Sequence, residues 1–253
     1  MLVFLSMLAL GAVVGFVGAG GAGVVIALLH VGFGVPIHTA LAVALASMTF
    51  TVLSGAVSHY REGEVIVRIG AVMGASGSVG AYLGAAVSNL MDPAFLTKMT
   101  GIMLLASASI LYTKLYHDQL LSRLFRIPEE PIRGKKLYIF GILTGLVNGF
   151  LSGAFGIGAA AFIQLTLLIV FGVPLLQSLG TSMMIILPIS ASGGLSYLFN
   201  DRLDLTIFVE TLLGLMLGAY IGSKGTHLAP RPVLKACIVA TPTIGSLTLL
   251  LFR

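Results

Sequence analysis

Gly15-Phe16-Val17-Gly18-Ala19-Gly20-Gly21-Ala22-Gly23 is the stretch that decides the fold, and it returns as Gly149-Phe150-Leu151-Ser152-Gly153-Ala154-Phe155-Gly156-Ile157-Gly158. Each copy lies in an apolar run, 2–29 or 136–170, that exceeds the about 20 residues of one membrane span. Glycines this dense disfavour a continuous helix. We therefore expect each run to form two pieces folded back at the glycines; one long tilted helix, or a close-packed helix face, is the alternative.

The composition excludes a soluble domain. The 253 residues are 57% hydrophobic and only 9% charged, with a mean hydropathy of +1.07, whereas ordinary globular chains carry about 25% charged residues. The sequence predicts an all-α polytopic membrane protein. The apolar segments that we expect in the membrane are 2–29, 39–59, 65–89, 94–116, 136–170, 177–199, 205–223 and 232–252.

The chain contains an internal repeat at an offset of 138 residues. Phe33-Gly34-Val35-Pro36 recurs as Phe171-Gly172-Val173-Pro174, and Gly80-Ala81-Tyr82-Leu83-Gly84 recurs as Gly218-Ala219-Tyr220-Ile221-Gly222. Blocks this similar at one offset indicate two homologous halves. We divide the chain into a first transmembrane repeat (1–116), a basic linker (117–135) and a second transmembrane repeat (136–253).

The charges bear on the orientation of these halves. Six of the 14 Lys and Arg residues lie between 114 and 136, in the linker and directly beside it. Cytoplasmic loops collect such charge, so we expect the linker to lie in the cytoplasm. If every segment spans once, the halves are parallel; if the first segment of each half enters and returns on one side, they are inverted. The inverted arrangement places one more cation on the inside. The glycine breaks favour inverted repeats more strongly than this margin does.

The broken segments are the candidate functional site. In lipid, a broken backbone is tolerated only where protein or a water-filled cavity satisfies its amides. A helix that restarts after a break directs unpaired N–H groups and the positive end of its dipole at that cavity, which favours an anion, and paired broken helices are the best pointer to a transporter's binding site. The residues that we expect at the site are Gly18, Gly20, Gly21, Gly156 and Gly158 with the polar neighbours Asn148, Ser152 and Gln164.

Other functional classes find little support in the residues. No catalytic constellation is recognisable, so we expect no enzyme. The single Cys237 and five scattered histidines offer no metal-ligand spacing, and we expect neither a metal nor a cofactor. The basic excess is explained by membrane orientation, without nucleic acid. Glu210 is the one carboxylate some turns into a span, where it either couples protons or pairs with Arg202 or Arg68.

Five features occur in order along the chain: Gly15-x-x-Gly18-x-Gly20-Gly21, Gly34-Val35-Pro36 with Ala40, Tyr60-Arg61-Glu62-Gly63, the central basic loop, and Leu179-Gly180-Thr181-Ser182. Taken together, these motifs resemble the TauE/SafE family of sulfite and organosulfonate exporters. They cover nearly the whole chain in order.

The resemblance implies a cell-membrane exporter that moves small sulfur-containing anions, such as sulfite or sulfoacetate, through two inverted halves. Carried over by position, it adds Thr181 and Ser182 to the site. The first half has Val43-Ala44 at the equivalent positions, which puts a symmetric site in doubt. A secondary transporter working by alternating access is the leading hypothesis; a passive anion channel and a non-transporting scaffold subunit stay open, as does a homo-oligomer.

Overall fold

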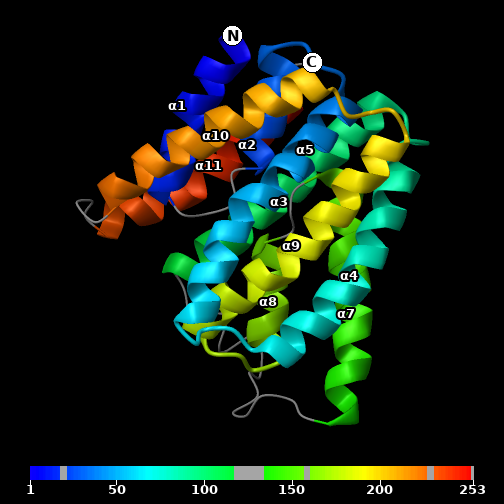
Figure 1. Ribbon diagram of the computed structural model, residues 1–253, viewed down its shortest axis with the longest axis vertical. Helices are drawn as coiled ribbons and strands as arrows, with labels where there is room; N and C mark the ends of the chain where they lie inside the picture. Colours follow the sequence, from blue (N-terminus) through cyan, green and yellow to red (C-terminus); the bar gives the residue numbers. More distant parts are fainter. Residues whose placement is uncertain (18–21, 117–133, 157–159, 227–230, 252–253) are drawn as a thin grey trace.

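All regular secondary structure in the described part of the computed structural model is helical (Figure 1). The described part comprises residues 1–17, 22–116, 134–156, 160–226 and 231–251. The elements are α1 (Leu2–Val17), α2 (Ala22–Ala27), a π-helical turn η1 (Leu28–Gly32), α3 (Ile37–Arg61), α4 (Val67–Ser88), α5 (Pro93–Tyr116), α7 (Lys135–Phe155), α8 (Ala160–Ile169), α9 (Leu175–Phe199), α10 (Leu205–Thr226) and α11 (Arg231–Leu251). The all-α prediction is confirmed, and six of the eight predicted segments correspond to single helices.

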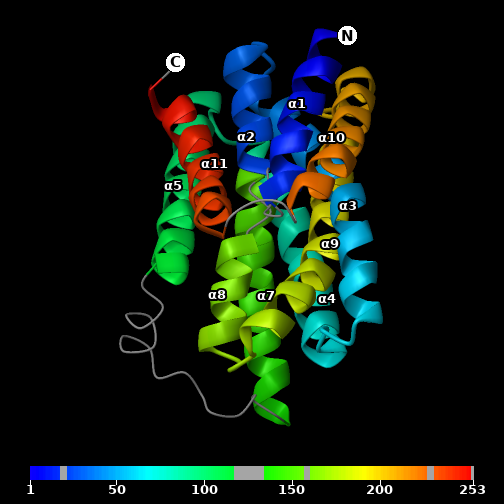
Figure 2. The same cartoon turned by 90° about the vertical axis from the view of Figure 1, so that its left-hand side faces the viewer.

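The two segments that carry the glycine stretches are each broken, as predicted. The first contains α1 and α2, and the fifth contains α7 and α8. In Figure 2, α1 runs down from the N-terminal end and α2 returns towards that end, whereas α7 runs up from the opposite end and α8 returns to it. The alternative of one long tilted helix is therefore wrong for both segments.

The repeated Phe-Gly-Val-Pro block forms the same turn in both halves. Gly34 and Gly172 have φ of +67° and +63°, a backbone conformation that glycine adopts without strain. The Val35 N–H donates to the Leu29 carbonyl at 3.0 Å, and the Val173 N–H donates to the Leu167 carbonyl at 3.0 Å. The proline that follows supplies the fixed φ that suits a helix start. These turns end the second piece of each broken segment and begin α3 and α9.

Glycines let the helices of the two halves approach to backbone contact. A β-carbon on Gly11 of α1 would lie 2.7 Å from the Leu215 carbonyl oxygen of α10. At the positions 138 residues away, a β-carbon on Gly149 of α7 would overlap the backbone of Gly77 in α4. Such small-residue contacts are how helices associate without water to drive them together. The opening helix of each half thus packs on a helix of the other half.

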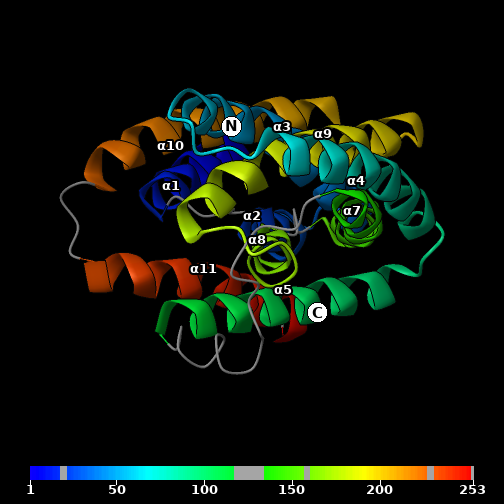
Figure 3. The ribbon, with the colours of Figure 1, turned by 90° about the horizontal axis from the view of Figure 1, so that it is seen from below.

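The helices lie in three layers when viewed from below (Figure 3). α5 and α11 form one outer layer, α3 and α9 belong to the opposite one, and α2 and α8 lie between them. The largest buried cluster gathers around the start of α3, where Leu41 and Leu45 are fully buried. The second pieces of both broken segments are therefore the central elements of the molecule.

The surface is apolar while small and polar residues face inwards, the pattern of a membrane protein. On α7, Ile139, Leu143 and Val147 are exposed, whereas Gly145 and Asn148 are buried. Within the described residues, five helices are long and apolar enough to cross a membrane, namely those at 37–61, 67–88, 93–113, 135–155 and 177–199. The multi-pass membrane prediction is confirmed.

Candidate functional site

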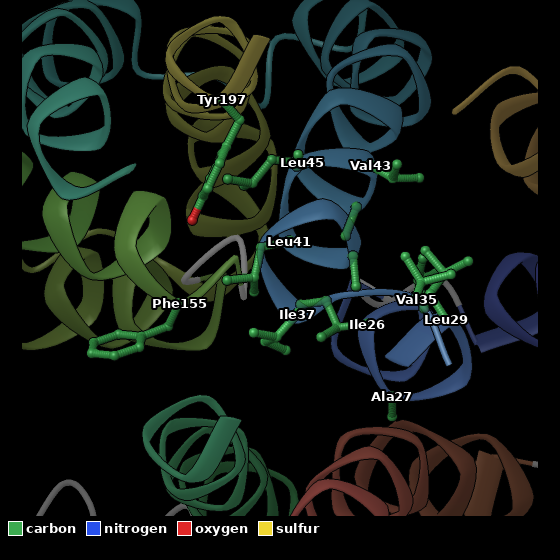
Figure 4. Packing of buried hydrophobic residues seen from close by; sticks show 14 of the residues in the cluster. Ile26, Ala27, Leu29, Val35, Ile37, Leu41, Val43, Leu45, Phe155 and Tyr197 are labelled. Carbon is green, nitrogen blue, oxygen red and sulfur yellow. The ribbon is translucent and has the colours of Figure 1, made fainter. Parts of the chain in front are cut away.

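The broken end of α7 is held against the first half of the chain by Gly156. This residue ends α7 with φ of +65°, and its N–H donates to the Ser152 carbonyl at 2.8 Å. A β-carbon here would lie 2.5 Å from Leu41 Cδ2 and 3.1 Å from Ile26 Cδ1. Gly156 is thus required both for the turn and for contact with α2 and α3, which Figure 4 shows around Leu41 and Ile26.

Asn148 ties the two pieces of this broken segment together. Its Nδ2 donates to the Thr144 carbonyl at 2.8 Å and to Thr166 Oγ1 of α8 at 3.2 Å. Thr166 in turn donates to the Phe162 carbonyl at 2.9 Å. Asn148 therefore braces α7 against α8, and the sequence did not single out its partner Thr166.

Ser152 lies one helical turn nearer the break than Asn148, so it lies on the same face of α7, towards α8. The side chain is fully buried, and its hydroxyl has no hydrogen-bond partner among the described residues. Hydroxyls elsewhere in these helices bond the carbonyl four residues back, as Ser109 does with Leu105 at 2.9 Å. An orphaned buried hydroxyl costs about 1–3 kcal/mol. The Ser152 hydroxyl is therefore available to bind a ligand beside the break.

The other residues expected at the breaks are only partly described. Gln164 is half-buried on α8. Gly18, Gly20, Gly21 and Gly158 lie outside the described residues. The described part of the site thus consists of the end of α7 and the α8 face opposite it.

Thr181 and Ser182 lie elsewhere, near the start of α9. Thr181 Oγ1 accepts the Ile66 N–H at 3.0 Å, which secures the beginning of α4. Ser182 Oγ donates to the Leu179 carbonyl of its own helix at 2.8 Å. Both side chains are buried. The hydrogen bonds found for this pair reach the α3–α4 turn and the pair's own helix α9, not the end of α7, so the structure does not join them to Ser152.

Beside Thr181, the α3–α4 turn carries a cluster that the sequence analysis missed. His59, Glu62 and Glu64 each place one ligand atom within 4.8 Å of the others, a set that could hold a metal ion. His59 Nδ1 and Glu64 Oε2 are already joined at 2.6 Å. The spacing of histidine with two nearby glutamates was the signal in the sequence. In this structure the His59–Glu64 pair joins the end of α3 to the α3–α4 turn and lies away from the centre of the molecule.

Glu210 pairs with the start of α1. Its Oε1 lies 2.7 Å from the ammonium group of Met1, and its Oε2 accepts the Phe4 N–H at 3.3 Å. The side chain is 29% exposed. Its ion pair is therefore with Met1, where the sequence suggested Arg202 or Arg68.

Tyr197 is a further buried polar residue that the sequence analysis missed. It is fully buried in α9, and its hydroxyl donates to the Gly153 carbonyl in the last turn of α7 at 3.1 Å. Figure 4 shows the side chain extending from α9 towards α7. A single tyrosine in the apolar segment 177–199 was the only signal available.

Comparison with known proteins identifies the family. The model of the family described as sulfite exporter TauE/SafE matches residues 3–249. The "Probable membrane transporter protein YdhB" of Bacillus subtilis is 42% identical over 250 residues, covering 99% of this chain and 100% of that protein. "Probable membrane transporter protein YjnA" of the same organism is 29% identical over 237 residues, 90% of each chain.

A more distant match is the "Probable membrane transporter protein MJ0441" of Methanocaldococcus jannaschii, 37% identical over 118 residues, which are 46% of this chain and 39% of that protein. No solved structure matches the chain. The chain therefore belongs to the sulfite exporter TauE/SafE family of membrane transporters.

Proposed function

We propose that this protein exports small sulfur-containing anions, such as sulfite or sulfoacetate, across the cytoplasmic membrane, and that the anion binds where the opening helix of each half is broken. The observation that carries the proposal is the Ser152 hydroxyl one turn before the break in α7, which is fully buried and has no hydrogen-bond partner in the part of the chain that the structure describes. A sulfonate or sulfite oxygen is an acceptor for this hydroxyl.

The electrostatics of the break favour an anion. The first N–H groups of a helix lack intrahelical partners and carry the positive end of its dipole. α8 begins on the far side of the break from Ser152, and Asn148 holds the two pieces together through Thr166. A bound anion would thus receive the Ser152 hydroxyl from one piece and backbone N–H groups from the other.

The arrangement of the halves supports alternating access. α3 and α9, which correspond at the offset of 138 residues, run in opposite directions (Figure 1). The broken segments enter from opposite ends (Figure 2). We infer that the halves are inverted repeats in the membrane, with the linker 117–135 in the cytoplasm. Inverted halves around a central site allow one half to rock against the other.

The energetics require no coupling ion. An inside-negative membrane potential drives an anion outwards by about 2.3 kcal/mol per charge per 100 mV. Glu210 is half-buried beside Met1 and Phe4 rather than beside Ser152. We therefore favour a potential-driven exporter, with proton coupling through Glu210 as the alternative that mutation tests.

The test is the thermal stability of the detergent-purified protein with sulfite, sulfoacetate, taurine, sulfate and chloride. A ligand that binds the folded state alone raises stability, by about 2.7 kcal/mol at one hundred times its Kd. We expect stabilisation by sulfite or a sulfonate in the wild type, and its loss in Ser152→Ala.

The control is Thr211→Val, which removes another buried, unpartnered hydroxyl, in α10. Neither variant loses a side-chain hydrogen bond to the residues that the structure describes, so both should fold at least as stably as the wild type. Stabilisation that survives in Ser152→Ala, or that no sulfur oxyanion produces in the wild type, would contradict the proposal.

A further inference from the structure

The last turn of α7 ends in carbonyl groups that the helix itself cannot satisfy, because no following turn supplies their N–H partners. The Ser152 carbonyl receives the Gly156 N–H at 2.8 Å. The next carbonyl, that of Gly153, receives the hydroxyl of Tyr197 from α9 at 3.1 Å. A side chain from another helix thus caps the broken end of α7.

Two residues of the first half support Tyr197: Ser88 contacts its hydroxyl, and His38 contacts the carbonyl of Ser88. The Tyr197 hydroxyl lies 2.5 Å from Ser88 Oγ of α4, and His38 Nε2 of α3 lies 2.9 Å from the Ser88 carbonyl. The Ser88 hydroxyl also lies 2.9 Å from the Ala85 carbonyl of its own helix. When Tyr197 gives its one hydroxyl proton to Gly153, Ser88 directs its own proton to Tyr197 rather than to Ala85. Since a carbonyl only accepts, His38 Nε2 must carry a proton. We call His38, Ser88, Tyr197 and Gly153 the Tyr197 clasp.

The clasp is buried throughout and joins four helices at the broken end of α7. His38 is 6% exposed, and Ser88 and Tyr197 are 0% exposed. Close packing leaves little room for it to shift: a β-carbon on Gly193, one turn before Tyr197, would lie 3.7 Å from the Gly153 Cα and 3.1 Å from Leu45 Cδ1. The clasp therefore fixes the position of the Gly153 carbonyl relative to α3, α4 and α9.

We propose that Tyr197 is a positioning residue of the anion site, which rests on the proposed function. The carboxyl end of a helix carries the negative end of its dipole, which repels a nearby anion. The Tyr197 hydroxyl donates to the Gly153 carbonyl, so this carbonyl's negative end points at the hydroxyl and not at the anion. The same bond fixes the turn of α7 that carries Ser152. Tyr197 thereby acts on the anion through the α7 backbone, without touching it.

The tyrosine of the clasp has no counterpart in the first half of the chain. The position 138 residues before Tyr197 is His59, which pairs with Glu64 in the α3–α4 turn. The residue at that position therefore supplies no hydroxyl. We infer that the two breaks contribute unequally to the anion site.

Tyr197→Phe tests the proposal because it removes only the hydroxyl and keeps the ring. The matched control is Ser196→Ala: Ser196 is also 0% exposed, and it donates to the Tyr82 carbonyl of α4 at 3.0 Å. Both variants lose one buried bond to a backbone carbonyl. Tyr197→Phe also loses the contact with Ser88, whose hydroxyl keeps the Ala85 carbonyl as an acceptor at 2.9 Å. Should Tyr197→Phe fail to fold, Ser88→Ala is a milder substitute that removes the donor to Tyr197.

Two measurements separate positioning from general destabilisation. Amide hydrogen exchange without anion should be faster in Tyr197→Phe around residues 153–156, and unchanged there in Ser196→Ala. Binding should be measured with sulfite at alkaline pH, where it is a dianion, and with the monoanion methanesulfonate. We expect Tyr197→Phe to weaken sulfite binding about fivefold to tenfold, as for loss of one buried hydrogen bond, and methanesulfonate binding by less.

A purely structural role predicts equal losses for both anions, or the same losses in Ser196→Ala, and either result would overturn the proposal. Unchanged sulfite affinity in Tyr197→Phe would overturn it as well. Wild-type protein that binds neither anion would contradict the proposed function itself, and the anion-positioning role would fall with it.

Discussion

Gly149 of α7 lies in backbone contact with Gly77 of α4, so closely that a β-carbon on Gly149 would overlap the Gly77 carbonyl. The contact of Gly11 with Leu215 is its counterpart in the other half. These contacts join the opening helix of each half to the other half. When either broken segment moves, its opening helix must therefore slide along a glycine-lined surface of its partner helix.

Replacing Gly149 should therefore destabilise the protein. In Gly149→Ala the new methyl group meets backbone atoms that cannot move aside, and overpacking of this kind costs about 1–3 kcal/mol. Differential scanning fluorimetry should show a lower Tm, by about 2 to 4 °C for each kcal/mol. Ala75→Leu, at an exposed position of α4 near Gly77, is the control, and an equal change in both would argue against backbone contact.

Gly34 and Gly156 both have positive φ but differ in their packing, so replacing each with alanine distinguishes the cost of backbone strain from the cost of overpacking. At Gly34, φ is +67° and a β-carbon would meet nothing within 4 Å, whereas at Gly156, φ is +65° and a β-carbon would meet Leu41 at 2.5 Å. Gly34→Ala should cost about 1 kcal/mol, the strain of a left-handed residue. Gly156→Ala should cost clearly more and weaken anion binding, as measured by thermal unfolding with and without sulfite. Equal stability of the two variants would count against a close contact between Gly156 and Leu41.

The sequence was sufficient to predict the helices and the breaks because these features are local. Hydropathy located segments 177–199 and 205–223, and the structure has Leu175–Phe199 and Leu205–Thr226. The repeated Phe-Gly-Val-Pro turn followed from the preferences of glycine and proline. Glycine density marked the breaks, since it disfavours a continuous helix wherever the rest of the chain lies.

The polar contacts could not be predicted, because they depend on residues far apart in the sequence. Nothing local connects Tyr197 with Gly153 or with Ser88, and nothing local shows that Thr181 receives the Ile66 N–H. Ser152 was selected for lying in the glycine stretch. That its hydroxyl lacks a partner emerges only from the packed structure.

Neutralising Glu210 should leave transport intact if the potential alone drives export. Glu210→Gln removes the charge that pairs with the Met1 ammonium at 2.7 Å, so we expect at most a small loss of stability from this partly exposed pair. Flux in proteoliposomes, with and without an imposed pH gradient, is the measurement. A wild-type flux that follows the pH gradient and a variant flux that does not would instead establish proton coupling through Glu210.

The inferred inverted topology predicts opposite sides for two corresponding turns. Glu62 in the α3–α4 turn should face the cytoplasm, and Asp201 in the α9–α10 turn should face outwards. Single cysteines at these positions, in a chain whose Cys237 is replaced by alanine, can be labelled in intact cells with a membrane-impermeant maleimide. We expect labelling at 201 alone; labelling of both positions or of neither would indicate parallel halves.

Sulfite flux through Ser152→Ala is the most direct test of the central claim. Proteoliposomes containing wild type, Ser152→Ala or Thr211→Val would be loaded with radiolabelled sulfite, and efflux followed under an inside-negative potential. We predict rapid efflux for the wild type and for Thr211→Val, and efflux at least tenfold slower for Ser152→Ala despite its normal thermal stability. Equal efflux from all three, or none above protein-free vesicles for the wild type, would contradict an anion site at the broken end of α7.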